Sequence, residues 1–132
     1  MKAASVVVLR RDSVLMVERG RPPFERLWSF PGGRAEPGEE AEATARRELF
    51  EETRLEIGAL TRLGAFQPAP DVSPLLLTVF AGRAGATDPQ PGDDALRAEF
   101  VPFGRVLTRP RTAGAASWIV RALSALAEPP LL

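Results

Sequence analysis

Three glutamates lie close together near the middle of the chain, and they are the first residues that could do chemistry. Glu48, Glu51 and Glu52 fall within an arc of about 100° if their segment is helical. Like charges on one arc repel, each pair costing roughly a few tenths of a kcal/mol. Clustered carboxylate oxygens are typical of Mg²⁺ or Mn²⁺ sites. The alternative is a solvated helix face, because exposed charge is common.

The residue types that the chain lacks restrict the catalytic groups it could use. The 132-residue sequence contains no Cys, His or Tyr, and its lysine is Lys2, near the N-terminus. Thiolate nucleophiles, disulfides, cysteine-ligated zinc and a histidine base are therefore excluded. Catalysis would depend on carboxylates, arginines and any cation that the carboxylates hold.

The longer spacing around the glutamates is more specific than the cluster alone. The chain reads Gly33-x₅-Glu39-x₇-Arg47-Glu48-Leu49-x-Glu51-Glu52-x-Arg54-Leu55. This resembles the signature of the Nudix hydrolases, Gly-x₅-Glu-x₇-Arg-Glu-aliphatic-x-Glu-Glu-x-Gly-aliphatic. Eight of the nine specified positions match, and the exception is Arg54 in place of glycine. Either the backbone at Arg54 is left-handed, as a glycine cap would be, or the helix runs one residue further.

The resemblance implies a metal site built on this helix. Glu48, Glu51 and Glu52 would hold Mg²⁺ or Mn²⁺, and the backbone carbonyl of Gly32 or Gly33 would add an oxygen. The resemblance also makes Glu48 a candidate to orient or deprotonate the attacking water.

Further roles follow from the same resemblance. Arg47 would pair with Glu39 and tether the preceding loop to the helix, with Gly33 supporting the site. Some family members complete the metal site with a glutamate on a late strand. Glu99 is the best match by context, and Asp93 and Asp94 are its rivals.

Substrate-binding residues are expected close to the motif in sequence. Arg19 and Arg26 could clamp phosphate oxygens with paired hydrogen bonds. Trp28 and Glu36 belong to segments that look like the family's usual lead-in to the motif, and we expect both to contact the substrate. For Trp28 the alternative is burial in the core.

The function implied is hydrolysis of a diphosphate linkage by metal-activated water. The substrate would be a small nucleoside diphosphate derivative, such as an ADP-ribose-like molecule, an NDP-sugar or a (d)NTP. The chain looks like bacterial members described as ADP-ribose pyrophosphatase-like. A binding or regulatory domain without catalysis is the alternative, although such relatives usually lose motif glutamates that are present here. Isomerases of this fold that use a catalytic cysteine are excluded.

Bulk properties indicate a soluble protein with one domain over residues 1–132. Hydrophobic residues make up 45% and charged residues 26% of the chain, and the formal net charge is zero. Zero net charge argues against nucleic acid as a partner. We expect no membrane span, a cytoplasmic location and a monomer or homodimer.

The pattern of elements predicts an α/β fold, and the resemblance implies a Nudix-type α/β/α sandwich with a mixed central β-sheet. Apolar β-branched runs predict strands, and a 3.6-residue period predicts helices. We expect strands at 5–9, 14–17, 57–66, 75–82 and 99–103, and helices at 39–55 and 112–127. The apolar stretch 27–30 should stop at Pro31-Gly32-Gly33, and 83–94 should be a surface loop. Pro129-Pro130 should end the last helix.

Overall fold

The computed structural model describes residues 1–22 and 24–127. Its strands are β1 (Lys2–Arg10), β2 (Ser13–Arg19), β3 (Trp28–Ser29), β4 (Gly32–Arg34), β5 (Thr61–Phe66), β6 (Leu76–Arg83) and β7 (Ala95–Pro102). Its helices are α1 (Ala41–Thr53), α2 (Phe103–Val106) and α3 (Ala115–Leu126). In the described part of the chain, no helix has the length and apolar character needed to cross a membrane.

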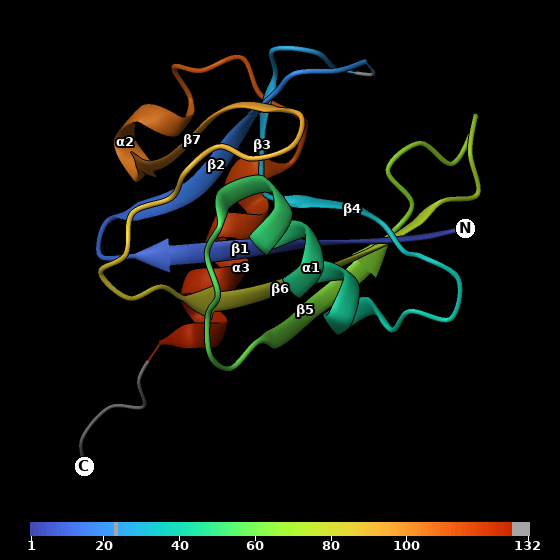
Figure 1. Ribbon diagram of the computed structural model, residues 1–132, viewed down its shortest axis with the longest axis horizontal. Helices are drawn as coiled ribbons and strands as arrows, with labels where there is room; N and C mark the ends of the chain where they lie inside the picture. Colours follow the sequence, from blue (N-terminus) through green and yellow to red (C-terminus); the bar gives the residue numbers. More distant parts are fainter. Residues whose placement is uncertain (23, 128–132) are drawn as a thin grey trace.

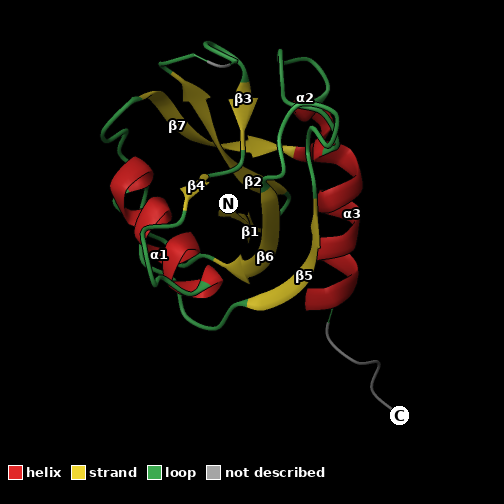
Figure 2. Ribbon diagram, turned by 90° about the vertical axis from the view of Figure 1, so that its right-hand side faces the viewer, coloured by secondary structure: helices red, strands yellow, loops and turns green. Residues whose placement is uncertain are grey.

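The strands form one mixed sheet in the order β3-β2-β1-β6-β5, with β4 also paired to β1 and β7 to β2. β1 runs parallel to β6, whereas β1 with β2, β2 with β7 and β5 with β6 are antiparallel. Helix α1 lies on one side of the strands and α3 on the other (Figures 1 and 2). The predicted α/β/α sandwich with a mixed sheet is therefore confirmed.

The central strand β1 is buried from Ala3 to Leu9, a run that is apolar apart from Ser5, because both faces of the strand are covered. Its alternate side chains divide between two cores, as the period of two along a strand requires. On the α1 side the core contains Val6, Val8, Leu15, Ala45 and Leu49. On the α3 side it contains Val7, Leu9, Met16, Ile119 and Ala122. The α1 stripe of alanines and leucine thus holds the glutamate-bearing helix against the sheet.

The region before α1 differs from the prediction. Pro31-Gly32-Gly33 was expected to stop any strand, yet Gly32–Arg34 forms β4, antiparallel to β1. The amide of Val6 also donates to the carbonyl of Pro31. Ladder hydrogen bonds come from the backbone, so the absence of side chains at the two glycines does not prevent pairing.

The region after α1 also differs, because β5 begins at Thr61 rather than at residue 57. Leu55 is buried, and Ile57 and Leu60 are partly buried against the core beneath α1. These apolar residues close the end of that core, so their hydrophobicity reflects burial and not strand pairing.

The C-terminal elements are shifted from their predicted bounds. β7 begins at Ala95, four residues earlier than predicted, and Phe103 starts the short helix α2. α3 begins at Ala115 and not at Thr112, whose amide donates to the carbonyl of Trp28. The predicted stop at Pro129-Pro130 lies outside the described residues.

Candidate active site

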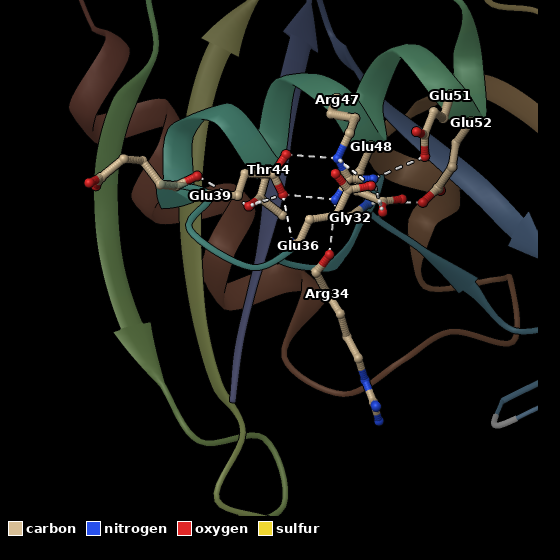
Figure 3. A network of polar contacts seen from close by, with 10 residues as sticks. Gly32, Arg34, Glu36, Glu39, Thr44, Arg47, Glu48, Glu51 and Glu52 are labelled. Carbon is tan, nitrogen blue, oxygen red and sulfur yellow. Dashed lines mark hydrogen bonds and ion pairs between the residues drawn. The ribbon is translucent and has the colours of Figure 1, made fainter.

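Helix α1 presents Glu48 and Glu52 toward the β4 segment. Glu42 lies in its first turn, where the helix dipole favours a negative charge. Thr44, Ala45, Leu49 and Thr53 are buried against the rest of the protein. Figure 3 shows Arg47 at the centre of the polar contacts, with Glu51 and Glu52 toward the C-terminal end of the helix.

Arg47 organises this side of the helix. Its Nε and Nη2 donate to the two carboxylate oxygens of Glu39, at 2.8 and 2.9 Å. Its Nη1 donates to Glu48 at 2.9 Å and to Glu51 at 3.2 Å, and Nη2 also donates to the carbonyl of Arg34 at 3.0 Å. The predicted ion pair with Glu39 is therefore present, and Arg47 in addition holds two of the motif glutamates.

Glu39 is bound from several directions at once. Besides Arg47, it accepts hydrogen bonds from the hydroxyl of Thr44 at 2.8 Å and from the amide of Glu36 at 3.0 Å. The hydrogen bonds from Arg47 and then from the Glu36 amide lower the pKa of Glu39 from 4.5 to about 2. Glu39 therefore fastens the loop before α1 to the helix as an anion at neutral pH.

Glu48 and Glu52 occupy the most enclosed part of the site. A Cβ on Gly33 would lie 2.5 Å from the carboxylate carbon of Glu48, so a side chain at this position would displace that carboxylate. The amide of Gly32 donates to Glu52 at 3.3 Å. Burial, followed by the neighbouring charge of Glu48, raises the pKa of Glu52 from 4.5 to about 8. Without a cation, this pair of carboxylates resists carrying two charges.

The donor set suits a hard divalent cation. The carboxylates of Glu48, Glu51 and Glu52 line one cavity, and carboxylate oxygens are ligands that Mg²⁺ and Mn²⁺ prefer. A cation would also offset the electrostatic cost of placing Glu48 beside Glu52. Within residues 1–22 and 24–127, no three acidic side chains already surround a common point at metal-binding distance. Arg47 accounts for part of this, because it draws Glu48 and Glu51 toward itself.

A cavity of about 330 Å³ opens beside these carboxylates. Its lining residues are Val17, Arg19, Gly20, Arg21, Gly32, Gly33, Arg34, Glu48, Glu51, Glu52, Asp93, Asp94 and Ala95. The structure thus brings Arg19, the two glycines and the three glutamates of the predicted site together. Arg47 and Glu39 support the site from behind, and Glu36 lies beside Arg47 at 3.7 Å with an exposed side chain.

Glu99, expected to complete the metal site, lies on the other face of the sheet. It pairs with Met16 in the β2–β7 ladder, and Met16 belongs to the core on the α3 side. Its carboxylate accepts a hydrogen bond from Arg109 at 3.0 Å. Since α1 covers the opposite face, the sheet itself separates Glu99 from Glu48.

Trp28 and Arg26 are likewise not brought to the cavity. Trp28 is 2% exposed, and the guanidinium groups of Arg97 and Arg109 lie over its ring, so burial explains this residue. Arg26 is exposed in the loop after β2, with a φ of 67°. Neither residue is placed to contact a ligand in the cavity.

Four other charged residues line the cavity, where Glu99, Trp28 and Arg26 do not. Arg21 and Arg34 join Arg19 in the lining, and Asp93 and Asp94, the predicted rivals of Glu99, lie at the cavity from the end of the β6–β7 connection. Arg21 and Asp94 form an ion pair at 2.9 Å. In the sequence, the only sign that Asp93 and Asp94 belong to the site is that two aspartates stand next to each other just before a strand. Nothing in the sequence distinguishes Arg21 and Arg34 from the other arginines.

Arg54 resolves the question left by its departure from the motif. α1 ends at Thr53, and Arg54 is the C-cap with a φ of 63°. Its amide donates to the carbonyl of Phe50. Arginine therefore adopts the left-handed conformation that the family's glycine would take, at a cost of roughly 1–2 kcal/mol.

Comparison with known proteins agrees with this arrangement. The chain matches the NUDIX domain family model over residues 1–122. It is 40% identical over 67 residues to the putative 8-oxo-dGTP diphosphatase of Bacillus subtilis (50% of this chain, 43% of that protein). It is 38% identical over 78 residues to the ADP-ribose pyrophosphatase of the same organism (58% and 42%).

The chain thus spans less than half the length of these two curated relatives. Among solved structures, the NUDIX domain of Shewanella oneidensis NrtR, complexed with ADP ribose, superposes with a TM-score of 0.84 at 21% identity. That match covers 96% of this chain and 88% of the other. The family model covers nearly the whole chain and includes every motif residue of the cavity. The chain belongs to the NUDIX domain family.

Proposed function

We propose that this protein hydrolyses a diphosphate linkage in a nucleoside diphosphate derivative, with a divalent cation held by Glu48, Glu51 and Glu52. The observation that carries the proposal is the charge arrangement of the cavity. Three arginines and three motif glutamates line the same space of about 330 Å³. Arginines alone would bind an anion, and glutamates alone would repel it. Together they suit a polyanion that arrives with a cation.

The arginines supply the phosphate contacts in this proposal. Guanidinium groups donate paired hydrogen bonds to phosphate oxygens, and Arg19, Arg21 and Arg34 all line the cavity. Arg19 also lies close enough to lower the pKa of Glu52, against the larger effects of burial and Glu48. A phosphate bound at Arg19 would therefore lie beside the carboxylates.

The glutamates supply the cation ligands and the water position. When bound, Mg²⁺ or Mn²⁺ would neutralise charge on the phosphate oxygens and make a water molecule more acidic. Glu48 accepts a hydrogen bond from Arg47 at 2.9 Å, and its carboxylate fills the space that a side chain at residue 33 would take. A carboxylate held in this way can orient a water molecule toward phosphorus and accept its proton.

The substrate class is suggested by the relatives and by the lining. The relatives' names point to ADP-ribose and to 8-oxo-dGTP, both of which contain a diphosphate linkage. The side chains named in the cavity lining include no aromatic ring. The cavity therefore favours recognition of the charged diphosphate, and the nucleoside would extend toward its opening.

A substrate screen tests the proposal. Release of AMP or phosphate would be measured for ADP-ribose, NDP-sugars and (d)NTPs including 8-oxo-dGTP, with Mg²⁺, with Mn²⁺ and with excess EDTA. We expect cation-dependent hydrolysis of at least one diphosphate compound. A matched pair of variants, Glu52→Gln and Glu40→Gln, removes one carboxylate inside and one outside the cavity. Full turnover in EDTA would contradict the proposal, as would binding of every compound without hydrolysis, which would indicate a binding domain.

A further inference from the structure

We infer that Arg54 is a positioning residue, which clamps the end of the β6–β7 connection onto the C-terminal turn of α1 and so fixes the mouth of the cavity. The inference rests on the proposed function only for its kinetic consequence. Arg54 stands where the family motif has glycine, and its backbone keeps the left-handed conformation of a glycine, with a φ of 63°. A non-glycine residue in this conformation is strained, and contacts of its side chain can offset that strain.

The first observation is where that side chain lies. A Cβ placed on Gly92 would be 3.1 Å from Nε and 3.2 Å from Cζ of Arg54, so the guanidinium group packs directly on the Gly92 backbone. Gly92 is buried, although both its neighbours in sequence are exposed. On another side, Cζ of Arg54 lies 5.5 Å from the centre of the Phe50 ring. The guanidinium group therefore bridges the helix end and the connection.

The second observation is the backbone contact beneath the guanidinium group. The amide of Gly92 donates to the carbonyl of Glu52 at 3.0 Å, and the amide of Gln90 donates to the carbonyl of Thr53 at 2.9 Å. The same Cβ on Gly92 would lie 2.2 Å from the carbonyl oxygen of Glu51, so the two segments touch without room for a side chain. Figure 1 draws this connection in yellow and orange, running past the end of α1.

The third observation concerns the two aspartates that come directly after Gly92 in the chain. Asp93 and Asp94 line the cavity, and Asp94 forms the 2.9 Å ion pair with Arg21 across it. The carbonyl that accepts the Gly92 hydrogen bond is that of Glu52, in the α1 turn that also carries Glu51. This contact fixes the position of the two aspartates relative to the motif carboxylates, and the Arg54 side chain packs over it.

The variant Arg54→Gly tests this inference, because it restores the motif glycine and removes the backbone strain. Hydrogen exchange of the full chain should show faster exchange of the Gly92 and Gln90 amides, by about tenfold, with an unchanged or higher melting temperature. With Mg²⁺ and ADP-ribose as the probe, KM should rise by about threefold or more while kcat changes less than KM. A merely structural arginine would not separate KM from kcat in this way.

Arg11→Gly is the matched control. Arg11 is also an exposed arginine with a left-handed backbone, at a φ of 53°, and it is not among the residues that line the cavity. The substitution Arg11→Gly should relieve the same backbone strain without changing the exchange rate of the Gly92 amide or the KM. Gly92→Ala should likewise raise the KM, but with a lower melting temperature, because its Cβ would clash with the Glu51 carbonyl. Adding Arg54→Gly to Gly92→Ala should raise the KM little further.

Wild-type exchange at Gly92 in the Arg54→Gly variant would overturn the inference, as would faster exchange with an unchanged KM. The proposed function would survive either result, because wild-type turnover is measured in the same experiment. Conversely, absence of wild-type turnover with ADP-ribose and with every other compound of the substrate screen would end the proposed function, while the exchange rates would still decide whether Arg54 clamps the connection.

Discussion

At the scale of single residues, the carboxylate of Glu52 lies where a negative charge is disfavoured. Burial and the adjacent Glu48 raise its pKa to about 8. The motif spacing predicted that these glutamates share one helix face, because that follows from 3.6 residues per turn. It did not predict that Arg47 would bind Glu48 and Glu51 as well as Glu39, since rotamers and distances depend on the β4 backbone behind them.

Glu52→Gln should separate catalysis from stability. The amide side chain can still accept the hydrogen bond from Gly32 and, like the protonated carboxyl that the raised pKa of Glu52 favours, places no second negative charge beside Glu48. We expect kcat to fall by at least about 10²-fold through loss of a cation ligand, with a melting temperature equal to or above that of wild type. Steady-state kinetics and thermal melting measure both. A variant that melts well below wild type with unchanged kcat would identify Glu52 as structural.

Glu39→Gln should make stability depend on pH in a defined window. The pKa of Glu39 falls from 4.5 to about 2 on folding, so its contribution is fully present above pH 4.5 and is lost as the pH falls toward 2. The difference in unfolding free energy between wild type and Glu39→Gln should therefore be constant near neutral pH and shrink through that window. Urea unfolding at a series of pH values measures it. A difference that persists undiminished at about pH 2 would mean that packing, and not the charge, stabilises this site.

At the scale of elements, the sequence did not predict on which face of the sheet a given strand residue lies. The strand containing Glu99 was predicted, but a shift of one residue in its pairing exchanges the two faces of the sheet. The pairing of Glu99 with Met16 settles the question, and the helix covering each face is then determined. The short strand β4 was missed for a related reason, because Gly32 and Gly33 pair through their backbone and leave no side-chain pattern.

Glu99→Gln should consequently leave catalysis nearly unchanged. Its carboxylate binds Arg109 on the α3 side of the sheet, away from the cavity. We expect kcat within about threefold of wild type and an undiminished response to Mg²⁺, with at most a small loss of stability from the half-exposed ion pair. Kinetics at saturating Mg²⁺ would check this. A kcat lowered as far as in Glu52→Gln would place Glu99 in the metal site after all.

At the scale of the whole molecule, α1 is held by the sheet core, by the loop before it through Arg47 and Glu39, and by the β6–β7 connection through Gly92. The motif could be recognised from one segment of sequence, and the α/β/α arrangement agreed with the order of strands and helices. The cavity could not be predicted, because Arg21, Arg34, Asp93 and Asp94 reach it from segments far apart in the chain.

The central claim is that the α1 glutamates hold a divalent cation around a diphosphate, and thermal melting tests it most directly. At a concentration of 100 Kd, Mg²⁺ or Mn²⁺ should stabilise the folded form by about 2.7 kcal/mol. For a chain of this size the melting temperature should rise on the order of 10 °C. A nucleoside diphosphate should add a further rise only when the cation is present. Glu48→Gln should reduce the cation-induced rise, whereas Glu40→Gln, at the exposed start of the same helix, should retain it. Equal responses of the two variants to Mg²⁺ would mean that the glutamates form a solvated helix face, and would contradict the claim.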